Sequence, residues 1–280
     1  MGDVHIGTLA EAAEAEFMYT YESKASPLTR ATLGIGTLRI GGGVALSMRH
    51  DVTGYWSKAL GFGLTEPISS DLIDQVIRFY VAEGSSGAVI QIAPNARPAD
   101  WAEILARHDL RPESPWIKLA CKVDDVVADR GTGLRIGPVG ANDRRRWAST
   151  TLRAFGMPEY GLVDMMAESL AHPNFRPFAA WDGDEMVATA NLFIHGRLGS
   201  LSSTATVPSH CNRGAQSALI TARAREAANA GCVWLCAETG APEDGGTTSF
   251  GNLQRSGLRI LYERQNWVWS PPADSGRPSP

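Results

Sequence analysis

The sequence predicts an α/β fold with a mixed sheet, built from two tandem copies of one unit. Apolar residues recur three and four apart in some segments and alternate in others, which is typical of helices and strands in one chain. Residues 54–94 and 199–239 follow the same order of strand, turn, helix, glycine-containing turn and strand, at nearly equal length. Each copy then continues into a further helix and a final strand. The 280 residues suffice for two domains with separate cores.

The two domains are expected over residues 1–125 and 134–270. Between them, in "DDVVADRGTG" (124–133), charges and glycines replace the apolar periodicity. The last residues, 271–280, read "PPADSGRPSP", and this Pro- and Ser-rich composition predicts a disordered tail.

The second copy shows its elements in more detail. Its sequence predicts a strand, two amphipathic helices, three consecutive strands, a polar loop, a helix, a strand, a helix and a pair of strands. Asp182-Gly183 and Gly196-Arg197 lie where hairpin turns belong. The early segments are "GLRIGPVG" (133–140), "DRRRWASTTLRAF" (143–155), "LVDMMAESLAH" (162–172) and the three-strand run 175–207.

Composition excludes several functions. A net charge of -4 argues against a broad nucleic-acid surface, because binding phosphate backbones needs a basic excess. No run of about 18 apolar residues predicts a membrane span, and the acidic N-terminus does not resemble a signal peptide. The four cysteines are few and consistent with reduced thiols. We therefore expect a cytoplasmic protein with no nucleic-acid or membrane partner; the sequence leaves a homodimer open.

A polar loop with one glycine leads directly into a helix in "VPSHCNRGAQSALITARAREA" (207–227). A glycine there lets the backbone approach a ligand, and the free amides and dipole of the helix start favour an anion. The sequence therefore predicts a phosphate site that needs no metal; the alternative is that the glycine only starts the helix. The amides expected to bind the phosphate belong to Arg213, Gly214, Ala215, Gln216 and Ser217.

This segment, with "SFGNLQRSGLRILYERQNWVW" after it, resembles the core of the GCN5-related N-acetyltransferase (GNAT) superfamily. In that family the fourth strand binds the pantetheine arm of acetyl-coenzyme A, and the following loop cradles its pyrophosphate. The family loop reads Arg or Gln, two residues, Gly, one residue, then Gly or Ala. Here Cys211, Gly214 and Gln216 hold those positions, so Arg213-Gly214 matches and the flanking positions depart. The resemblance covers 134–269 well and the first half only weakly.

The resemblance implies acetyl-CoA as cosubstrate and the small-residue strand "LSSTAT" as the strip that binds pantetheine. Asn252, on the helix that flanks the coenzyme in the family, is expected to contact the same arm. No metal is expected, because the cysteines of "CVWLCAE" lack His partners at ligand spacing and fit small core residues. The residues expected in the pantetheine strip are Ser203, Thr204, Ala205 and Thr206.

Acetyl transfer to an amine needs a proton acceptor for the amine and a proton donor for the departing thiolate. Glu238, at the end of a predicted strand, is the expected general base, with a solvated strand end as the alternative. In many family members a Tyr that acts as the general acid lies four residues before a glycine. Here that position is Leu253, four residues before Gly257. Tyr262 is the remaining candidate acid, with core packing as its alternative role.

The first copy departs from this pattern where the phosphate loop should be. The matching segment reads "LTEPISSDLIDQ", in which Glu66 and Asp71 would repel a pyrophosphate and Pro67 removes a donor amide. We therefore expect a degenerate first domain that packs on the second and shapes the acceptor cleft.

Two functional classes stay open on the sequence. The first is an N-acetyltransferase that moves an acetyl group from acetyl-CoA to the primary amine of a small molecule. The second is a non-catalytic protein that binds or senses acyl-CoA with the same fold. Another nucleotide-binding α/β protein is disfavoured, because neither a Walker lysine nor a GxGxxG run is present. The acceptor cannot be read from the sequence, since function resides in the variable cleft.

Overall fold

A computed structural model describes residues 3–127, 131–241 and 248–272. Its α-helices are α1 (Asp3–Ser23), α2 (Pro27–Leu33), α3 (Ser70–Glu83), α4 (Trp101–Arg107), α5 (Arg144–Phe155), α6 (Leu162–Ser169), α7 (Ala215–Asn229) and α8 (Thr248–Arg255). Its strands are β1 (Ile35–Ile40), β2 (Gly43–Met48), β3 (Lys58–Leu60), β4 (Ala88–Gln91), β5 (Arg111–Lys122), β6 (Arg135–Pro138), β7 (Phe175–Asp182), β8 (Glu185–His195), β9 (Leu198–Thr206), β10 (Trp234–Gly240) and β11 (Arg259–Trp269).

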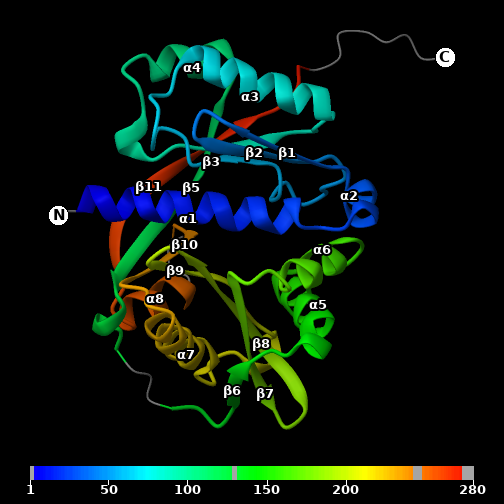
Figure 1. Cartoon of the computed structure of the whole chain (residues 1–280), viewed down its shortest axis with the longest axis vertical. Helices are drawn as coiled ribbons and strands as arrows, with labels where there is room; N and C mark the ends of the chain where they lie inside the picture. Colours follow the sequence, from blue (N-terminus) through cyan, green and yellow to red (C-terminus); the bar gives the residue numbers. More distant parts are fainter. Residues whose placement is uncertain (1–2, 128–130, 242–247, 273–280) are drawn as a thin grey trace.

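All of these strands form one mixed sheet, in the order β1-β2-β3-β4-β11-β5-β10-β9-β8-β7-β6. The pairs β3–β4 and β9–β10 are parallel. A helix connects the two strands of each pair, α3 in the first and α7 in the second, as the repeat pattern predicts. The strands β6 to β9 form an antiparallel meander with turns after Asp182 and at Gly196-Arg197. The predicted mixed α/β architecture is confirmed (Figure 1).

The two halves of the chain exchange strands in the middle of this sheet. The last strand, β11, lies between β4 and β5 of the first half, and β5 in turn pairs with β10 of the second half. The predicted final strand pair is wrong: residues 259–269 form one long strand with two register irregularities. An alternating apolar strand carries no mark of which neighbour it will join, so the sequence does not predict the exchange.

Helix α1 crosses the middle of the molecule and contacts strands of both halves of the chain (Figure 1). It packs on β1 and β2 from the first half and on β8, β9 and α6 from the second. Its apolar side chains Phe17, Met18 and Tyr21 belong to a core that includes residues of both halves. Two of its acidic residues, Glu11 and Glu14, are also buried, at 2% and 3% exposure. These two carboxylates of α1 are therefore part of the interior.

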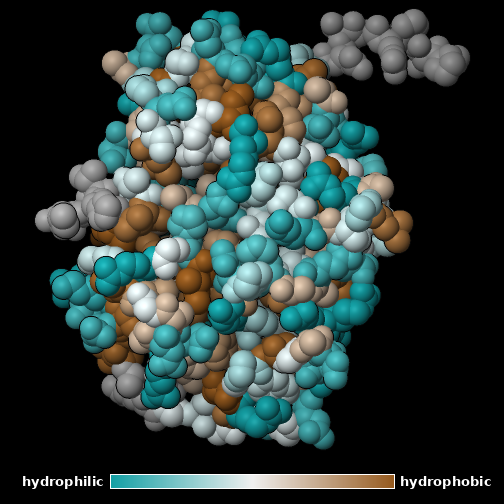
Figure 2. Space-filling view, in the orientation of Figure 1, coloured by the Kyte–Doolittle hydropathy of each residue, from teal (hydrophilic) through white to brown (hydrophobic). Residues whose placement is uncertain are grey.

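Figure 2 shows polar and apolar side chains interspersed over one face of the molecule. Large apolar side chains that are exposed, such as Val52 and Leu28, come from separate segments. Among the helices of the described ranges, none combines the length and the apolar character needed to cross a membrane.

Candidate active site

The sheet opens between β9 and β10. These strands pair only from Leu198 with Trp234 to Leu201 with Ala237, and the ladder stops there. On its other side β9 carries a register irregularity against β8, and Ser203 there has a φ of 50°. A left-handed residue in a strand marks a bulge, which bends the strand. The two parallel strands therefore diverge at the start of the small-residue strip.

The divergence leaves backbone groups of β9 without a sheet partner on the side of β10. The amide of Val207 donates to the carbonyl of Val187 in β8, so the preceding amide, that of Thr206, points to the opposite edge. Such amides face the gap and can pair with an extended ligand, as an added strand would.

A buried arginine holds this distorted stretch in place. Arg223 on α7 is fully buried and donates from Nη1 to the carbonyls of Asn191 (2.9 Å) and Ser202 (3.4 Å), and from Nε to Leu219 (3.0 Å). Burial lowers the pKa of Arg223 to about 9. The sequence did not single out this residue, because only the fold brings a helical arginine under the bulge.

A cavity of about 510 Å³ lies between the end of β9, the start of α7 and the end of α8. Eight of the ten residues predicted to bind coenzyme line it. Of the other two, Ser203 lines a neighbouring cavity, and Arg213 lines neither. Those eight residues are Thr204, Ala205, Thr206, Gly214, Ala215, Gln216, Ser217 and Asn252.

The start of α7 offers free amides to this cavity. Gly214 is the N-cap, with a φ of 81°, and no side chain of the described residues caps the helix. The matching helix of the first half, α3, differs: the Ser69 hydroxyl accepts from the Leu72 amide (3.2 Å), and Asp71 lies in the first turn. An anion is therefore favoured at α7 and disfavoured at α3.

The Arg213 side chain turns away from the cavity. Its Nη1 atom is 2.7 Å from Oδ2 of Asp182, and His210 Nε2 lies 3.3 Å from the same oxygen. Arg255, on α8, is the arginine that lines the cavity, and it also donates to Asn252. Asn252 in turn donates to Gln216, which joins α8 to the first turn of α7. Arg255 was not predicted, since only the helix packing places it there.

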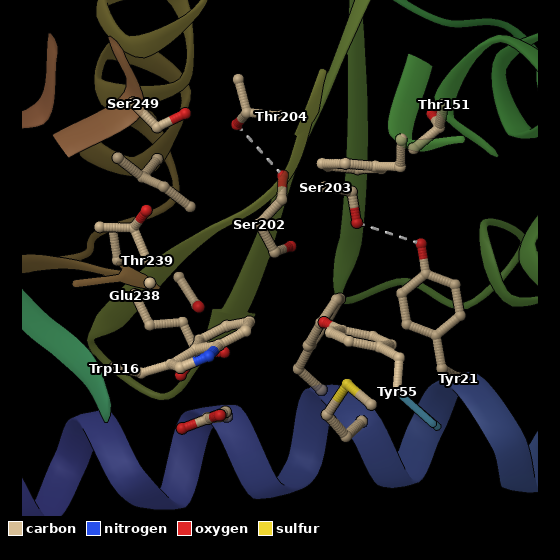
Figure 3. Close-up of a pocket in the computed structure, with 18 of the residues that line it drawn as sticks. Tyr21, Tyr55, Trp116, Thr151, Ser202, Ser203, Thr204, Glu238, Thr239 and Ser249 are labelled. Atoms are coloured by element: carbon tan, nitrogen blue, oxygen red, sulfur yellow. Dashed lines mark hydrogen bonds between the residues drawn. The ribbon is translucent and has the colours of Figure 1, made fainter. Parts of the chain in front are cut away.

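A second cavity, of about 380 Å³, adjoins the first and shares Phe155, Thr204, Gln216 and Ser249 with it. Figure 3 shows it between α1 and the diverging strands. Its walls come from both halves of the chain: α1, residues 55–56 and β5 from the first, and β9, β10 and the helices α5 to α8 from the second.

Glu238 lines this second cavity from the point where β10 leaves β9. Its Oε2 atom accepts from Lys118 Nζ (3.1 Å) and from Arg264 Nη2 (3.0 Å), and its side chain is 19% exposed. Burial, reinforced by the neighbouring Glu14 carboxylate, raises the pKa of Glu238 to about 7. Glu238 is thus a partly buried carboxyl group, fixed by two hydrogen bonds, that can gain or lose a proton near neutral pH.

The cations beside Glu238 belong to a buried cluster that fastens α1 to the sheet. Arg264 Nη1 donates to Glu11 (2.6 Å) and to Glu14 (2.7 Å), and Lys118 also donates to Glu14. Burial alone would raise the pKa of Glu14, but Arg264 and Lys118 outweigh it and hold that pKa well below its usual range. Removing one partner of such a network leaves an uncompensated buried charge.

Tyr262 belongs to the same cluster. Its hydroxyl donates to Oε1 of Glu11 (2.8 Å), and it lines neither cavity, so its role as general acid stays a prediction. Leu253, at the position of the acidic Tyr in the family, does line the second cavity. The tyrosines in the lining are Tyr21, whose hydroxyl lies 3.4 Å from that of Ser203, and Tyr55 (Figure 3). Both tyrosines come from the first half of the chain. The sequence predicts only that this half shapes the acceptor cleft.

No protein-family model and no curated protein matches the chain. Solved structures do share its fold. A GCN5-related N-acetyltransferase from Kribbella flavida is similar over 95% of this chain and 96% of its own, with a TM-score of 0.61 and 17% identity. A GCN5-related N-acetyltransferase from Sphaerobacter thermophilus is similar over 84% of this chain and 76% of its own, with a TM-score of 0.58 and 14% identity. A tandem GNAT protein from the clavulanic acid biosynthesis pathway is similar over 84% and 82%, with a TM-score of 0.58 and 12% identity.

The chain therefore has the fold of the GCN5-related N-acetyltransferases, in the tandem arrangement. This confirms the resemblance drawn from the sequence at the level of fold. In residues 3–127, 131–241 and 248–272, no group of three or more His, Cys, Asp or Glu side chains is arranged to hold a metal ion.

Proposed function

We propose that the protein is an acetyl-CoA-dependent N-acetyltransferase that acts on the primary amine of a small molecule. One observation carries the proposal: an anion site at α7, the open edge of β9 and the carboxyl of Glu238 follow one another along two adjoining cavities. This order matches the order of pyrophosphate, pantetheine and thioester in the coenzyme.

In this proposal the first cavity holds the coenzyme. The pyrophosphate lies on the amides of the α7 start, and Arg255 adds a positive charge. Arg213 contributes its amide, because its side chain is engaged with Asp182. Pantetheine extends along Ser203 to Thr206, with Asn252 beside it. The acetyl group then reaches the second cavity, between β9 and Glu238.

The chemistry needs a neutral amine. Glu238 accepts the proton of the amine, directly or through a water molecule, as the nitrogen attacks the thioester carbonyl. The C–N bond forms, the C–S bond breaks, and the thiolate takes up a proton as it leaves. A base with a pKa of about 7 is well matched to this task near neutral pH. Tyr262 as the proton donor remains a prediction, since its hydroxyl is bonded to Glu11.

The alternative is a protein that binds or senses acyl-CoA without turnover. The observation in its favour is Leu253, an apolar residue where many family members carry an acid. Calorimetric titration with acetyl-CoA, followed by an assay of free CoA released with a panel of amines, separates the two. Acceptor-dependent CoA release supports the enzyme; binding without it supports the sensor. An absence of acetyl-CoA binding would contradict both.

A further inference from the structure

We propose that the acceptor is a primary amine carried on a flat, apolar, aromatic body. This inference rests on the proposed function, and it comes from the wall of the second cavity that the first half supplies. Five aromatic rings line that wall and contact one another in sequence. The centroid distances are 4.9 Å from Phe17 to Tyr21, 6.0 Å from Tyr21 to Trp56, 5.1 Å from Trp56 to Tyr55 and 6.3 Å from Tyr55 to Trp116.

Further apolar side chains lie in the lining beside these rings. Phe155, Met157 and Met166, from α5, α6 and the loop between them, line it as well. Methionine side chains adapt to a ring that lies against them. A volume of about 380 Å³ is at the small end of ligand sites, which suits one or two fused rings with a short side chain.

The charged end of the chamber favours a cation. The cluster that includes Glu238 holds three carboxylates and two cations, so one negative charge is in excess when all five groups are ionised. Figure 3 shows Glu238 beside Trp116. The ammonium form of an amine is attracted to this charge, and the neutral form in equilibrium with it is the form that reacts at Glu238.

Lys58 is the third cation near this cluster. Its Nζ atom lies over the ring of Tyr55 (3.7 Å) and is 5.0 Å from the ring of Trp116. Burial lowers the pKa of Lys58, and the Glu238 and Glu14 carboxylates oppose that shift.

Polar acceptors fit less well. Hydroxyl groups of the lining lie along β9, at Ser203 and Thr204, where the coenzyme arm is placed, and outside the aromatic wall at Thr151, Thr239 and Ser249. A polar group of a sugar or a polyamine that lies against the faces of the rings would lose its water without gaining a partner, which is costly. The chamber therefore selects for a ring and against several hydroxyl or amino groups.

The test uses the full chain with saturating acetyl-CoA. We expect kcat/KM for 2-phenylethylamine and 2-(1-naphthyl)ethylamine to exceed that for glucosamine and putrescine at least tenfold. Calorimetry with CoA in place of acetyl-CoA measures amine binding without turnover, and the aryl amines should bind at least tenfold more tightly. Trp116→Ala should raise KM for the aryl amines about tenfold, and Trp116→Phe should restore most of the loss. The control is Tyr160→Ala, at a residue that is 80% exposed and outside both cavities. It should change neither KM for the aryl amines nor their affinity.

Each outcome decides a different claim. If acetyl-CoA binds and the polar amines react as fast or faster, the aromatic acceptor is wrong and the acetyltransferase stands. If acetyl-CoA binds and no amine reacts, amine binding decides, and equal affinities for the two classes overturn the inference. If acetyl-CoA does not bind, the proposed function fails, while the amine titration still reports whether the chamber prefers rings.

Discussion

Glu238→Gln is the substitution that tests the proposed chemistry most directly. Glutamine keeps the size of the side chain and can still accept hydrogen bonds from Lys118 and Arg264, but it cannot take up a proton from the amine. General-base catalysis contributes about 10²- to 10⁴-fold in rate, so we expect kcat to fall by about that factor. KM for acetyl-CoA should change little, because Glu238 lies outside the coenzyme cavity.

The pH dependence of the rate of the unmodified protein measures how much the rate depends on the ionisation of Glu238. A base must be deprotonated to act, so the rate should rise with pH through the pKa of Glu238, about 7. Such a group is about 9% ionised at pH 6 and about 91% ionised at pH 8, which predicts a rise of about tenfold. The amine substrate also loses its proton as pH rises. The profile of Glu238→Gln reports that contribution alone, and the difference between the profiles belongs to Glu238.

The assay is CoA release at saturating acetyl-CoA, from pH 5.5 to 8.5, with circular dichroism as the check on folding. A folded Glu238→Gln variant with the same rate and the same profile would remove this residue from the mechanism. A variant that binds acetyl-CoA more weakly but reacts at the original rate would place Glu238 in coenzyme binding instead.

Three further predictions concern the coenzyme site and its support. Gly214→Val should raise the Kd for acetyl-CoA at least tenfold, because a branched side chain strains a φ of 81° at the start of α7 and crowds the Gly131 carbonyl (3.4 Å) and Thr132; Gly231→Val, at a φ of 79° just past the other end of α7, has similar strain and should leave Kd unchanged in the same titration. The chain should bind one acetyl-CoA and not two, since the α3 start is capped and acidic, and a calorimetric stoichiometry of two would contradict this. Arg223→Met should lower the free energy of unfolding by about 2 kcal/mol or more, since buried carbonyls lose their donor, and an unchanged urea denaturation midpoint would show that the bulge needs no such support.

The parts of the site that the sequence predicts are those with local signals. Gly214 just before a helix, after a strand of small residues, specifies a turn, a helix start and an exposed strand edge within about fifteen residues. Each of these features depends on the conformational freedom of glycine or on strand and helix periodicity, which act over short distances. The eight coenzyme residues that line one cavity all come from this local pattern or from the helix next to it.

The rest of the site depends on contacts between distant segments. Glu11, Lys118, Glu238 and Arg264 come from four elements, and their pairing exists only once α1 crosses the sheet. In the sequence the acidic residues of α1 resemble a solvated run, because charged residues are rarely buried unless paired. Likewise the aromatic residues of the first half fit ordinary core packing until the fold places Trp116 in the chamber wall.

The strand exchange makes the second half dependent on the first. Residues 131–280 alone would lack β5, which pairs with both β10 and β11, and β4, the other neighbour of β11. They would also lack α1, so Arg264 would lose its partners Glu11 and Glu14, and the second cavity would lose its aromatic wall. We therefore expect this fragment to be insoluble or unfolded when expressed alone, and to form a soluble complex that binds acetyl-CoA when co-expressed with residues 1–127. Size-exclusion chromatography and calorimetry measure both outcomes. A soluble fragment 131–280 that binds acetyl-CoA as tightly as the whole chain would show that the exchanged strands do not support the coenzyme site.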